Sequence, residues 1–322
     1  MHPLALEILK RGLVVSWWTN IRFEKSFTPD LCMLLKASGC IGVSGGLEVA
    51  SDRLLALINK GITVSQVARV NGHFREAGIM VHAYLMYGFP TQTDQETIDS
   101  LEMVRQMFQA GILQSAYWHL FTMTAHSPVG LEPEKFHVRK VGDAEAGFAQ
   151  NDLMHEDPTG ADHERYGFGL KKSLFNFMHG HLLDQPLQKW FDFPVPRTTV
   201  APDHIVKALQ DEDLVSLRDA DRFLWLGKAP KLEFRERSKK GSRWEEAVLS
   251  FPTLTGTVEW RLDRDKGHWL AQLLKELSLR EDRVVTGKEI LASFDAAGLD
   301  DFELFWDNKP LNRIVKVGLV RI

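Results

Sequence analysis

The feature that most constrains the fold is a repeated unit in the first 120 residues, a short apolar segment followed by a helix with capping residues. The apolar segments predict β-strands at residues 13–18, 40–44, 79–87 and 115–121. The residues that can cap the intervening helices are Thr28 with Pro29, Ser51, Thr63 and Thr93. Strands that alternate with helices at about 35-residue spacing require parallel strands joined by right-handed crossovers.

Two of these helices carry the capping-box pattern, in which a hydroxyl and a Glu or Gln three residues later each satisfy a free N–H group. The pattern occurs at Thr63 with Gln66 and at Thr93 with Glu96. We therefore expect both side chains of each pair to hydrogen-bond at the start of their helix.

Parallel strands with helices outside them form either an open doubly wound sheet or part of a (β/α) barrel. In both folds, ligands bind beyond the carboxyl ends of the strands. Those ends are rich in glycine and in polar or charged residues here, at residues 18–22, 44–48, 87–91 and 121–127. The sequence therefore predicts a binding site at this edge of the sheet.

The end of the second strand carries the most informative residues. Gly45 and Gly46 follow Ser44 and would let the backbone approach a ligand closely. The carboxylate of Glu48 suits the vicinal hydroxyls of a ribose, and Lys60 could return from the next helix to pair with a ligand carboxylate. The alternative is a turn chosen for its glycines and a solvated lysine at a helix end. Spacing alone leaves both interpretations open.

Composition excludes several classes of protein. The net charge of −4, from 39 basic and 43 acidic residues, argues against a dedicated nucleic-acid or membrane-surface protein. The longest nearly apolar stretch, residues 79–89, is far shorter than the roughly 20 residues of a membrane span. Two cysteines, Cys32 and Cys40, cannot form a disulfide framework, which favours a reducing cytoplasm.

Taken together, the strand-end segments resemble those of radical S-adenosylmethionine (SAM) enzymes, over about residues 1–130. The segments are Arg22-Phe23-Glu24, residues 46–52 with Asn59-Lys60-Gly61, and Gly88-Phe89-Pro90-Thr91. The nearest likeness is to the branch that carries an N-terminal cobalamin-binding domain. Residues 125–128, 157–163 and 176–180 resemble the downstream part of the same branch.

The resemblance implies a SAM site. Glu48 matches the residue that hydrogen-bonds the ribose of SAM, and Lys60 matches the one that pairs with its carboxylate. Met86 matches the position whose backbone touches adenine, Tyr84 lies on the ribose side, and Arg22 belongs to the pocket. The expected cofactor-binding set is completed by Ser44, Gly45, Gly46 and Gly88. In this family a [4Fe-4S] cluster reduces SAM, and the resulting 5′-deoxyadenosyl radical abstracts a hydrogen atom from the substrate.

The sequence also departs from the family. The C-x3-C-x2-C cluster loop and the glycine-rich motif that binds the SAM amino group are absent, and Cys32 and Cys40 have the wrong spacing. Thr91 and Gln92 stand where the family usually has a small residue and Glu. We therefore expect a C-terminal portion of a radical SAM protein, with the cobalamin domain and the cluster ligands upstream. Its first strand would be an open edge, covered by residues 3–11 or by a homodimer.

Several histidines invite a functional interpretation. His119 and His126 flank the fourth strand end and could face the pocket as proton donors or substrate contacts, or could be hydrogen-bonded histidines at a strand end. A second group consists of His155, His163, His179 and His181, near Asp157 and Asp162. Its spacing matches no zinc pattern, so no metal site is predicted.

The predicted domains are a partial radical SAM (β/α) barrel at residues 1–130, a helical extension at 131–200 and a small α+β domain at 201–322. In the last, strands are expected at 223–226 and 255–262, helices at 267–277 and 286–297, and a terminal hairpin from 302–306 with 314–322, which resembles a winged helix. A basic run contains Arg235, Arg237, Lys239, Lys240 and Arg243. Interleaved glutamates largely cancel its charge, which favours a solvated loop over a nucleic-acid interface.

The function that the resemblance implies is SAM-dependent radical chemistry on an unidentified small molecule, as cobalamin-linked methyl transfer or rearrangement. Two alternatives stay open. One is a non-catalytic module that binds SAM or a nucleotide or acts as a scaffold, and the other is a nucleic-acid-binding protein.

Overall fold

The computed structural model describes residues 1–142, 151–158, 160–210, 217–239, 241–253, 256–279, 285–306 and 317–322. The chain divides into two compact units. The sheet unit comprises Trp17–Phe27 and Ile41–Glu212, and the terminal unit comprises Met1–Ser16, Thr28–Cys40 and Asp213–Ile322. Thr159, Lys240 and parts of the strands expected at 255–262 and 314–322 lie outside the described residues. The domain boundaries given above remain a prediction.

The sheet unit is built on a four-stranded sheet in the order β1-β2-β3-β4. Its strands are β1 (Trp17–Ile21), β2 (Cys40–Glu48), β3 (Met80–Tyr87) and β4 (Ser115–Leu120). β2 pairs with β3, and β3 with β4, in parallel. The expectation of an α/β fold on a parallel sheet is confirmed.

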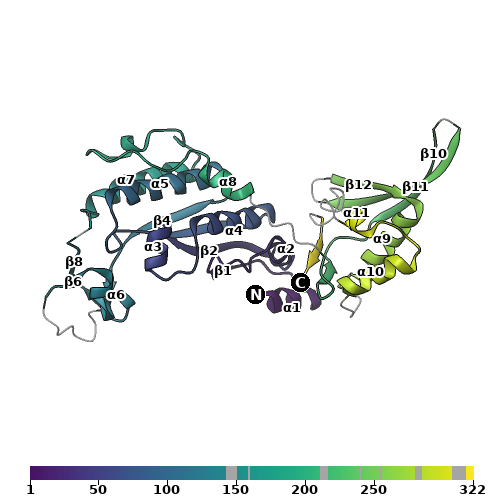
Figure 1. Cartoon of the computed structure of the whole chain (residues 1–322), viewed down its shortest axis with the longest axis horizontal. Helices are drawn as coiled ribbons and strands as arrows, with labels where there is room; N and C mark the ends of the chain where they lie inside the picture. The colour runs from purple at the N-terminus through teal and green to yellow at the C-terminus, as the bar shows by residue number, and fades with distance from the viewer. Residues whose placement is uncertain are drawn as a thin grey trace. The chain divides into compact units, whose positions relative to one another are not determined.

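Helices cover one face of this sheet (Figure 1). The helices of the unit are α3 (Asp52–Leu57), α4 (Val64–Glu76), α5 (Asp94–Gln109), α6 (Pro128–Leu131), α7 (Gly167–Met178) and α8 (His204–Gln210). The hydroxyls of Ser51, Thr63 and Thr93 accept the expected N-cap hydrogen bonds. The alternation along β3 follows from this covering, because Val81, Ala83, Leu85 and Tyr87 are buried while the residues between them point to the other face.

Two local predictions in this unit are wrong. Gln66 does not complete a capping box, because its side-chain amide donates to the Phe23 carbonyl at 2.8 Å instead. The first strand begins at Trp17, whereas Val14 is fully exposed. A run of β-branched residues therefore did not suffice to start the strand.

Short elements complete the sheet unit. They are β5 (Met123–Thr124), which pairs with β7 (Asp152–Leu153), β6 (Arg139–Lys140), which pairs with β8 (His155–Glu156), and the 3-10 turns η1 (Pro133–Phe136), η2 (Glu164–Tyr166) and η3 (Leu187–Trp190).

The terminal unit joins both ends of the chain. It contains α1 (His2–Lys10), α2 (Pro29–Ala37), β9 (Arg222–Trp225), β10 (Lys231–Lys239), β11 (Ser242–Thr253), β12 (Gly256–Asp263), α9 (Arg264–Glu276), β13 (Val285–Thr286), α10 (Gly287–Ala296), α11 (Phe302–Trp306) and β14 (Leu319–Arg321). β10, β11 and β12 form an antiparallel sheet, and β9 lies between β13 and β14. An aromatic core, in which Trp269 meets Phe294 at a centroid distance of 5.0 Å, joins the sheet to α9 and α10.

The predicted winged helix is not confirmed. Residues Phe302–Trp306 form helix α11 rather than a strand, and β14 pairs with β9. Phe302, Phe305 and Trp306 follow helical spacing, and this period outweighed their aromatic strand propensity. The basic run is also no loop, since Arg235, Arg237 and Lys239 lie in β10 and Arg243 in β11.

No helix in the described part of the chain combines the length and the apolar character needed to cross a membrane.

Candidate functional site

Glu48 and Lys60 meet beyond the carboxyl end of β2. The pairing of β2 with β3 shifts register between Gly46 and Glu48, and Glu48 has a φ of 58°. This bulge re-aims the Glu48 carboxylate, as bulges at strand ends commonly do. α3 then returns the chain, and the left-handed Gly61 (φ 70°) ends that turn directly after Lys60.

The two side chains form an ion pair, with Lys60 Nζ 2.6 Å from Glu48 Oε1. They are 21% and 24% exposed, so both remain within reach of a ligand. The guanidinium of Arg22 donates to the Lys60 carbonyl at 2.5 Å. Three residues expected in the SAM pocket are thus brought together from β1, β2 and the end of α3.

Two of the three expected site glycines, Gly45 and Gly88, have a packing reason to lack a side chain. A Cβ on Gly45 would lie 2.6 Å from the Phe23 ring, and one on Gly46 would lie 2.2 Å from Glu48 Oε1. At Gly88 (φ 78°) the same space is filled by Leu120 and His163. Gly45 and Gly88 therefore admit protein atoms, whereas the atoms beside Gly46 are the movable ends of Glu48 and Lys60, the two groups expected to meet the ligand.

The remaining expected residues lie on the face of the sheet opposite the helices. Ser44 is buried and accepts a hydrogen bond from the Trp18 indole at 2.9 Å. Tyr84 is 37% exposed on β3. Met86 packs at the edge of a small apolar cluster that includes Phe89. The assignment of these residues to a SAM pocket remains a prediction.

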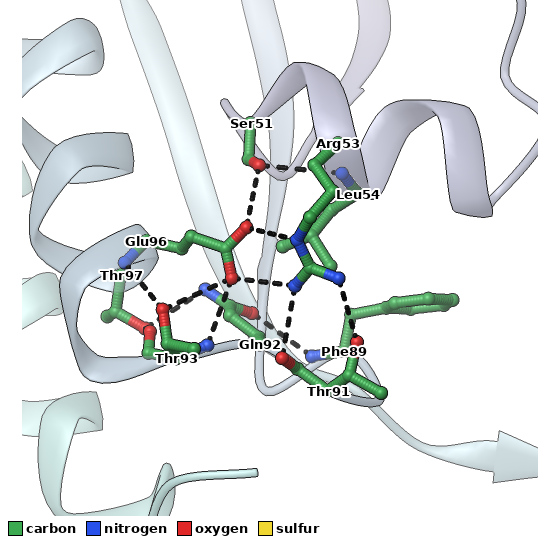
Figure 2. Close-up of polar contacts among 9 residues, drawn as sticks. All are labelled: Ser51, Arg53, Leu54, Phe89, Thr91, Gln92, Thr93, Glu96 and Thr97. Atoms are coloured by element: carbon green, nitrogen blue, oxygen red, sulfur yellow. Dashed lines mark hydrogen bonds and ion pairs between the residues drawn. The ribbon is translucent and has the colours of Figure 1, made fainter. Parts of the chain in front are cut away.

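The loop after β3 is held by a polar network that sequence reasoning missed (Figure 2). Arg53 binds both carboxylate oxygens of Glu96, at 2.7 and 2.8 Å, and also donates to the Thr91 carbonyl and hydroxyl. Thr91 has a φ of 67°, which is rare for a β-branched residue and is where the family usually has a small one. The Thr93–Glu96 capping box is confirmed, and Glu96 is shared between the box and Arg53.

Charge and burial oppose each other at Glu96. Burial alone would raise its pKa, but the hydrogen bonds from Arg53 and the Thr93 backbone outweigh burial and hold the pKa below its usual range. The only sequence signal for this network was the position of Arg53, two residues after the helix cap Ser51. That position does not indicate which residue Arg53 contacts.

Gln92 explains the second departure from the family pattern. Its side-chain oxygen accepts from the backbone N–H groups of Gly88 and Phe89, at 2.8 and 3.1 Å. Its amide nitrogen donates to Thr97, and the side chain is fully buried. The loop thus satisfies its own N–H groups and does not present these two to a ligand.

The downstream segment that resembles the family docks on this same loop. Asp157 accepts from the Thr91 N–H at 2.7 Å, and Tyr166 donates to Asp94 at 2.7 Å. His163 packs against Gly88, and burial lowers its pKa despite the nearby Gln92 carbonyl and Asp157. Segments that are about 70 residues apart in the sequence therefore form one structure around the end of β3.

The histidines do not assemble into a metal site. In the part of the chain that the structure covers, no cluster of three or more His, Cys, Asp or Glu side chains could hold a metal ion. His119 and His126 are both exposed near the end of β4. His119 lies on the open face of the sheet, in contact with Tyr117.

The cysteines do not fit a [4Fe-4S] cluster. The sequence has two, and both thiols are buried and form no disulfide. Burial, with Cys40 and Asp30 nearby, raises the pKa of Cys32 far above its usual range, which opposes the thiolate that a cluster ligand must be. The residues of this chain therefore supply no cluster site.

Comparison with known proteins gives a family match over three of the four strands of the sheet. Residues 15–104, which run from the approach to β1 into α5, match the model of the Radical SAM superfamily. This segment belongs to the radical SAM superfamily. The resemblance drawn from the strand-end motifs is confirmed.

Two curated relatives match about a third of this chain. An uncharacterized methyltransferase of Pyrococcus horikoshii is 29% identical over 104 residues, which cover 32% of this chain and 22% of that protein. The anaerobic magnesium-protoporphyrin IX monomethyl ester cyclase of Rubrivivax gelatinosus is 30% identical over 117 residues, covering 36% and 20%. The chain thus matches only about a fifth of the length of either relative.

Among solved structures, the radical SAM methyltransferase TsrM from Kitasatospora setae, with cobalamin and a [4Fe-4S] cluster bound, aligns with a TM-score of 0.41 and 16% identity. The alignment covers 55% of this chain and 40% of that one. A TM-score at this level does not establish a shared fold.

Proposed function

We propose that the radical SAM segment binds SAM through Glu48 and Lys60, with Glu48 accepting from the ribose hydroxyls and Lys60 pairing with the methionyl carboxylate. The supporting observation is the 2.6 Å approach of the two side chains beyond the end of β2. Once the pair separates, the carboxylate can accept from the ribose hydroxyls and the ammonium can pair with the carboxylate of an adenosyl amino acid.

The pair can open for a ligand at low cost. Exchange of the mutual contact for ligand contacts leaves neither charge without a partner, and an unpaired charge is the main cost of breaking a partly buried ion pair. The ligand's carboxylate neutralises Lys60, and its hydroxyls hydrogen-bond Glu48. The Arg22 contact to the Lys60 carbonyl holds the backbone in place during this exchange.

We further propose that bound SAM serves the radical chemistry of the superfamily, with methyl transfer or rearrangement as its outcome. Support comes from the family match and from a curated relative named as a methyltransferase. A link to cobalamin is part of the same proposal. The two buried cysteines of this chain do not fit a [4Fe-4S] cluster. The role that we propose for the residues of this chain is therefore to hold SAM.

The test is isothermal titration calorimetry with S-adenosylhomocysteine, which has the same ribose and carboxylate. We expect Glu48→Gln and Lys60→Met each to weaken binding by about tenfold or more, since charge-assisted hydrogen bonds contribute about 1.5–3 kcal/mol. Lys135→Met, in an exposed pair with Glu132, is the matched control and leaves the affinity unchanged.

A charge swap separates binding from folding. The double variant Glu48→Lys with Lys60→Glu keeps an ion pair at the same place but reverses the sites offered to the ligand. It should fold and fail to bind. Wild-type affinity in the swapped protein, or no binding to the wild type at millimolar ligand, contradicts the proposal.

A further inference from the structure

Lys60 lies in the turn between α3 and α4, and the backbone of this turn is unusual on both sides of the lysine. Asn59 has a φ of 56° and Gly61 has a φ of 70°, so two left-handed residues flank Lys60. Within the turn, the Lys60 N–H donates to the Leu55 carbonyl at 3.0 Å. A left-handed residue other than glycine persists where the surrounding structure holds it. The place of the Lys60 ammonium therefore depends on the contacts that hold this turn.

Asp52 closes the turn from outside. It lies in the first turn of α3, and its Oδ1 accepts a hydrogen bond of 2.8 Å from the backbone N–H of Val64, the first residue of α4. The two residues are 12 positions apart, and Lys60 lies between them. The N-terminus of α4 favours a carboxylate, because its free N–H groups carry partial positive charge. One side chain thus joins the start of α3 to the start of α4.

Asp52 and Arg22 hold the turn at different points. Arg22 reaches the Lys60 carbonyl from the end of β1, whereas Asp52 fixes the point at which the turn enters α4. Among the described residues, the ion pair of Lys60 is with Glu48 and not with Asp52. An effect of Asp52 on the Lys60 ammonium must therefore act through the backbone.

We propose that Asp52 is a positioning residue of the SAM site: by holding the Val64 N–H it fixes the Lys60 turn, and so sets how strongly the site binds the carboxylate of an adenosyl amino acid. This inference rests on the proposed function. Charge-assisted hydrogen bonds depend on short distances, so a small displacement of the ammonium weakens its contact with the carboxylate. Glu48, proposed to bind the ribose, lies on the bulge of β2, outside the turn that Asp52 closes.

The test compares two ligands by isothermal titration calorimetry on the full chain. S-adenosylhomocysteine carries the carboxylate, whereas 5′-methylthioadenosine has the same adenosine and sulfur without the amino-acid group. Asp52→Ala should weaken binding of S-adenosylhomocysteine by about fivefold and binding of 5′-methylthioadenosine by less than about twofold. Asp52→Asn keeps an oxygen that can accept from the Val64 N–H, and should retain the wild-type affinity for both ligands.

A second variant removes the same hydrogen bond from the donor side. Val64 is the first residue of α4, where proline is favoured, and Thr63 before it is extended (φ −119°, ψ 161°), as a residue before proline must be. Val64→Pro should therefore reproduce the selective loss. Asp263→Ala is the matched control, because Asp263 caps α9 by accepting from the Lys266 N–H at 2.9 Å. It should affect neither ligand.

A double-mutant cycle separates positioning from a general loss of stability. In a Lys60→Met background, Asp52→Ala should cause no further loss of S-adenosylhomocysteine affinity, because the ammonium that it positions is gone. Equal weakening of both ligands, an effect that persists in full without Lys60, or an Asp52→Ala variant that binds S-adenosylhomocysteine like the wild type overturns the inference alone. A wild-type protein that binds neither ligand refutes the proposed function and, with it, the positioning role.

Discussion

At the scale of single residues, His163 is a buried and poorly satisfied polar group beside Gly88. Among the described residues, neither ring nitrogen has a partner with hydrogen-bond geometry, although the Gln92 carbonyl is close enough to favour a proton. Burial dominates and lowers the pKa of His163. The imidazole of His163 is therefore protonated less readily in the folded chain than in the unfolded chain.

The first prediction follows from the lowered pKa of His163. Because the folded pKa of His163 lies below the unfolded value of about 6.5, the free energy of unfolding should fall as the pH drops through 6.5. His163→Phe removes the titrating group and two unsatisfied nitrogens, so we expect a shallower pH dependence and no loss of stability at pH 7.5. Urea unfolding between pH 7.5 and 5.5 measures both. The exposed His126→Gln is the control, and an unchanged slope in His163→Phe would contradict the assignment.

At the scale of elements, Glu96 joins two helices that are not neighbours in sequence. It closes the capping box of α5 with Thr93 and also binds Arg53 of α3 (Figure 2). The same guanidinium holds Thr91 in its left-handed conformation. One contact thus fixes both the loop after β3 and the helix that leads to Lys60.

The second prediction concerns this contact. Arg53→Met should lower the free energy of unfolding by about 1–2 kcal/mol, a modest value because the arginine is half exposed. Arg139→Met breaks an ion pair with Glu156 that is exposed on both sides and should change nothing measurable. Chemical denaturation of both variants checks the difference. Equal effects would show that the Arg53 contact is an ordinary surface pair.

At the scale of the whole molecule, the terminal unit is assembled from both ends of the chain. Asp30 Oδ1, in the first turn of α2, accepts a hydrogen bond of 2.9 Å from the backbone N–H of Arg321 in β14. Burial raises the pKa of Asp30, and the nearby Arg321 only partly opposes this effect. The ionised carboxylate is therefore a cost to the folded state at neutral pH.

The third prediction concerns the destabilisation of the folded state by the ionised Asp30 carboxylate. A raised carboxyl pKa means that stability falls as the pH rises through the unfolded value towards the folded one. Asp30→Asn keeps the acceptor and removes the charge, so it should raise the melting temperature at pH 7 and have less effect at pH 4. Asp30→Ala leaves the Arg321 N–H without its partner and should cost about 1 kcal/mol or more. A lower melting temperature for Asp30→Asn at pH 7 would refute the argument.

Prediction from sequence succeeded where the signal spans a few residues. The N-caps at Ser51 and Thr93 and the alternation of strands with helices follow from local hydrogen bonds and from the period of apolar side chains. The approach of Glu48 and Lys60 was expected only from the family resemblance, because their spacing alone left a solvated lysine equally open. Failures came where a distant group competed, as when the Phe23 carbonyl captured the Gln66 amide.

The sequence by itself determined the repeating strand and helix units and the parallel sheet that they require. Only the tertiary structure decided that Glu48 and Lys60 would meet beyond β2, that Arg53 would hold Thr91 and Glu96, and that residues 157–166 would dock on the loop after β3. The physical reason is the separation along the chain of the residues that interact. Capping and periodicity act between residues within one or two turns, whereas these contacts depend on which surfaces the packed helices and strands bring together.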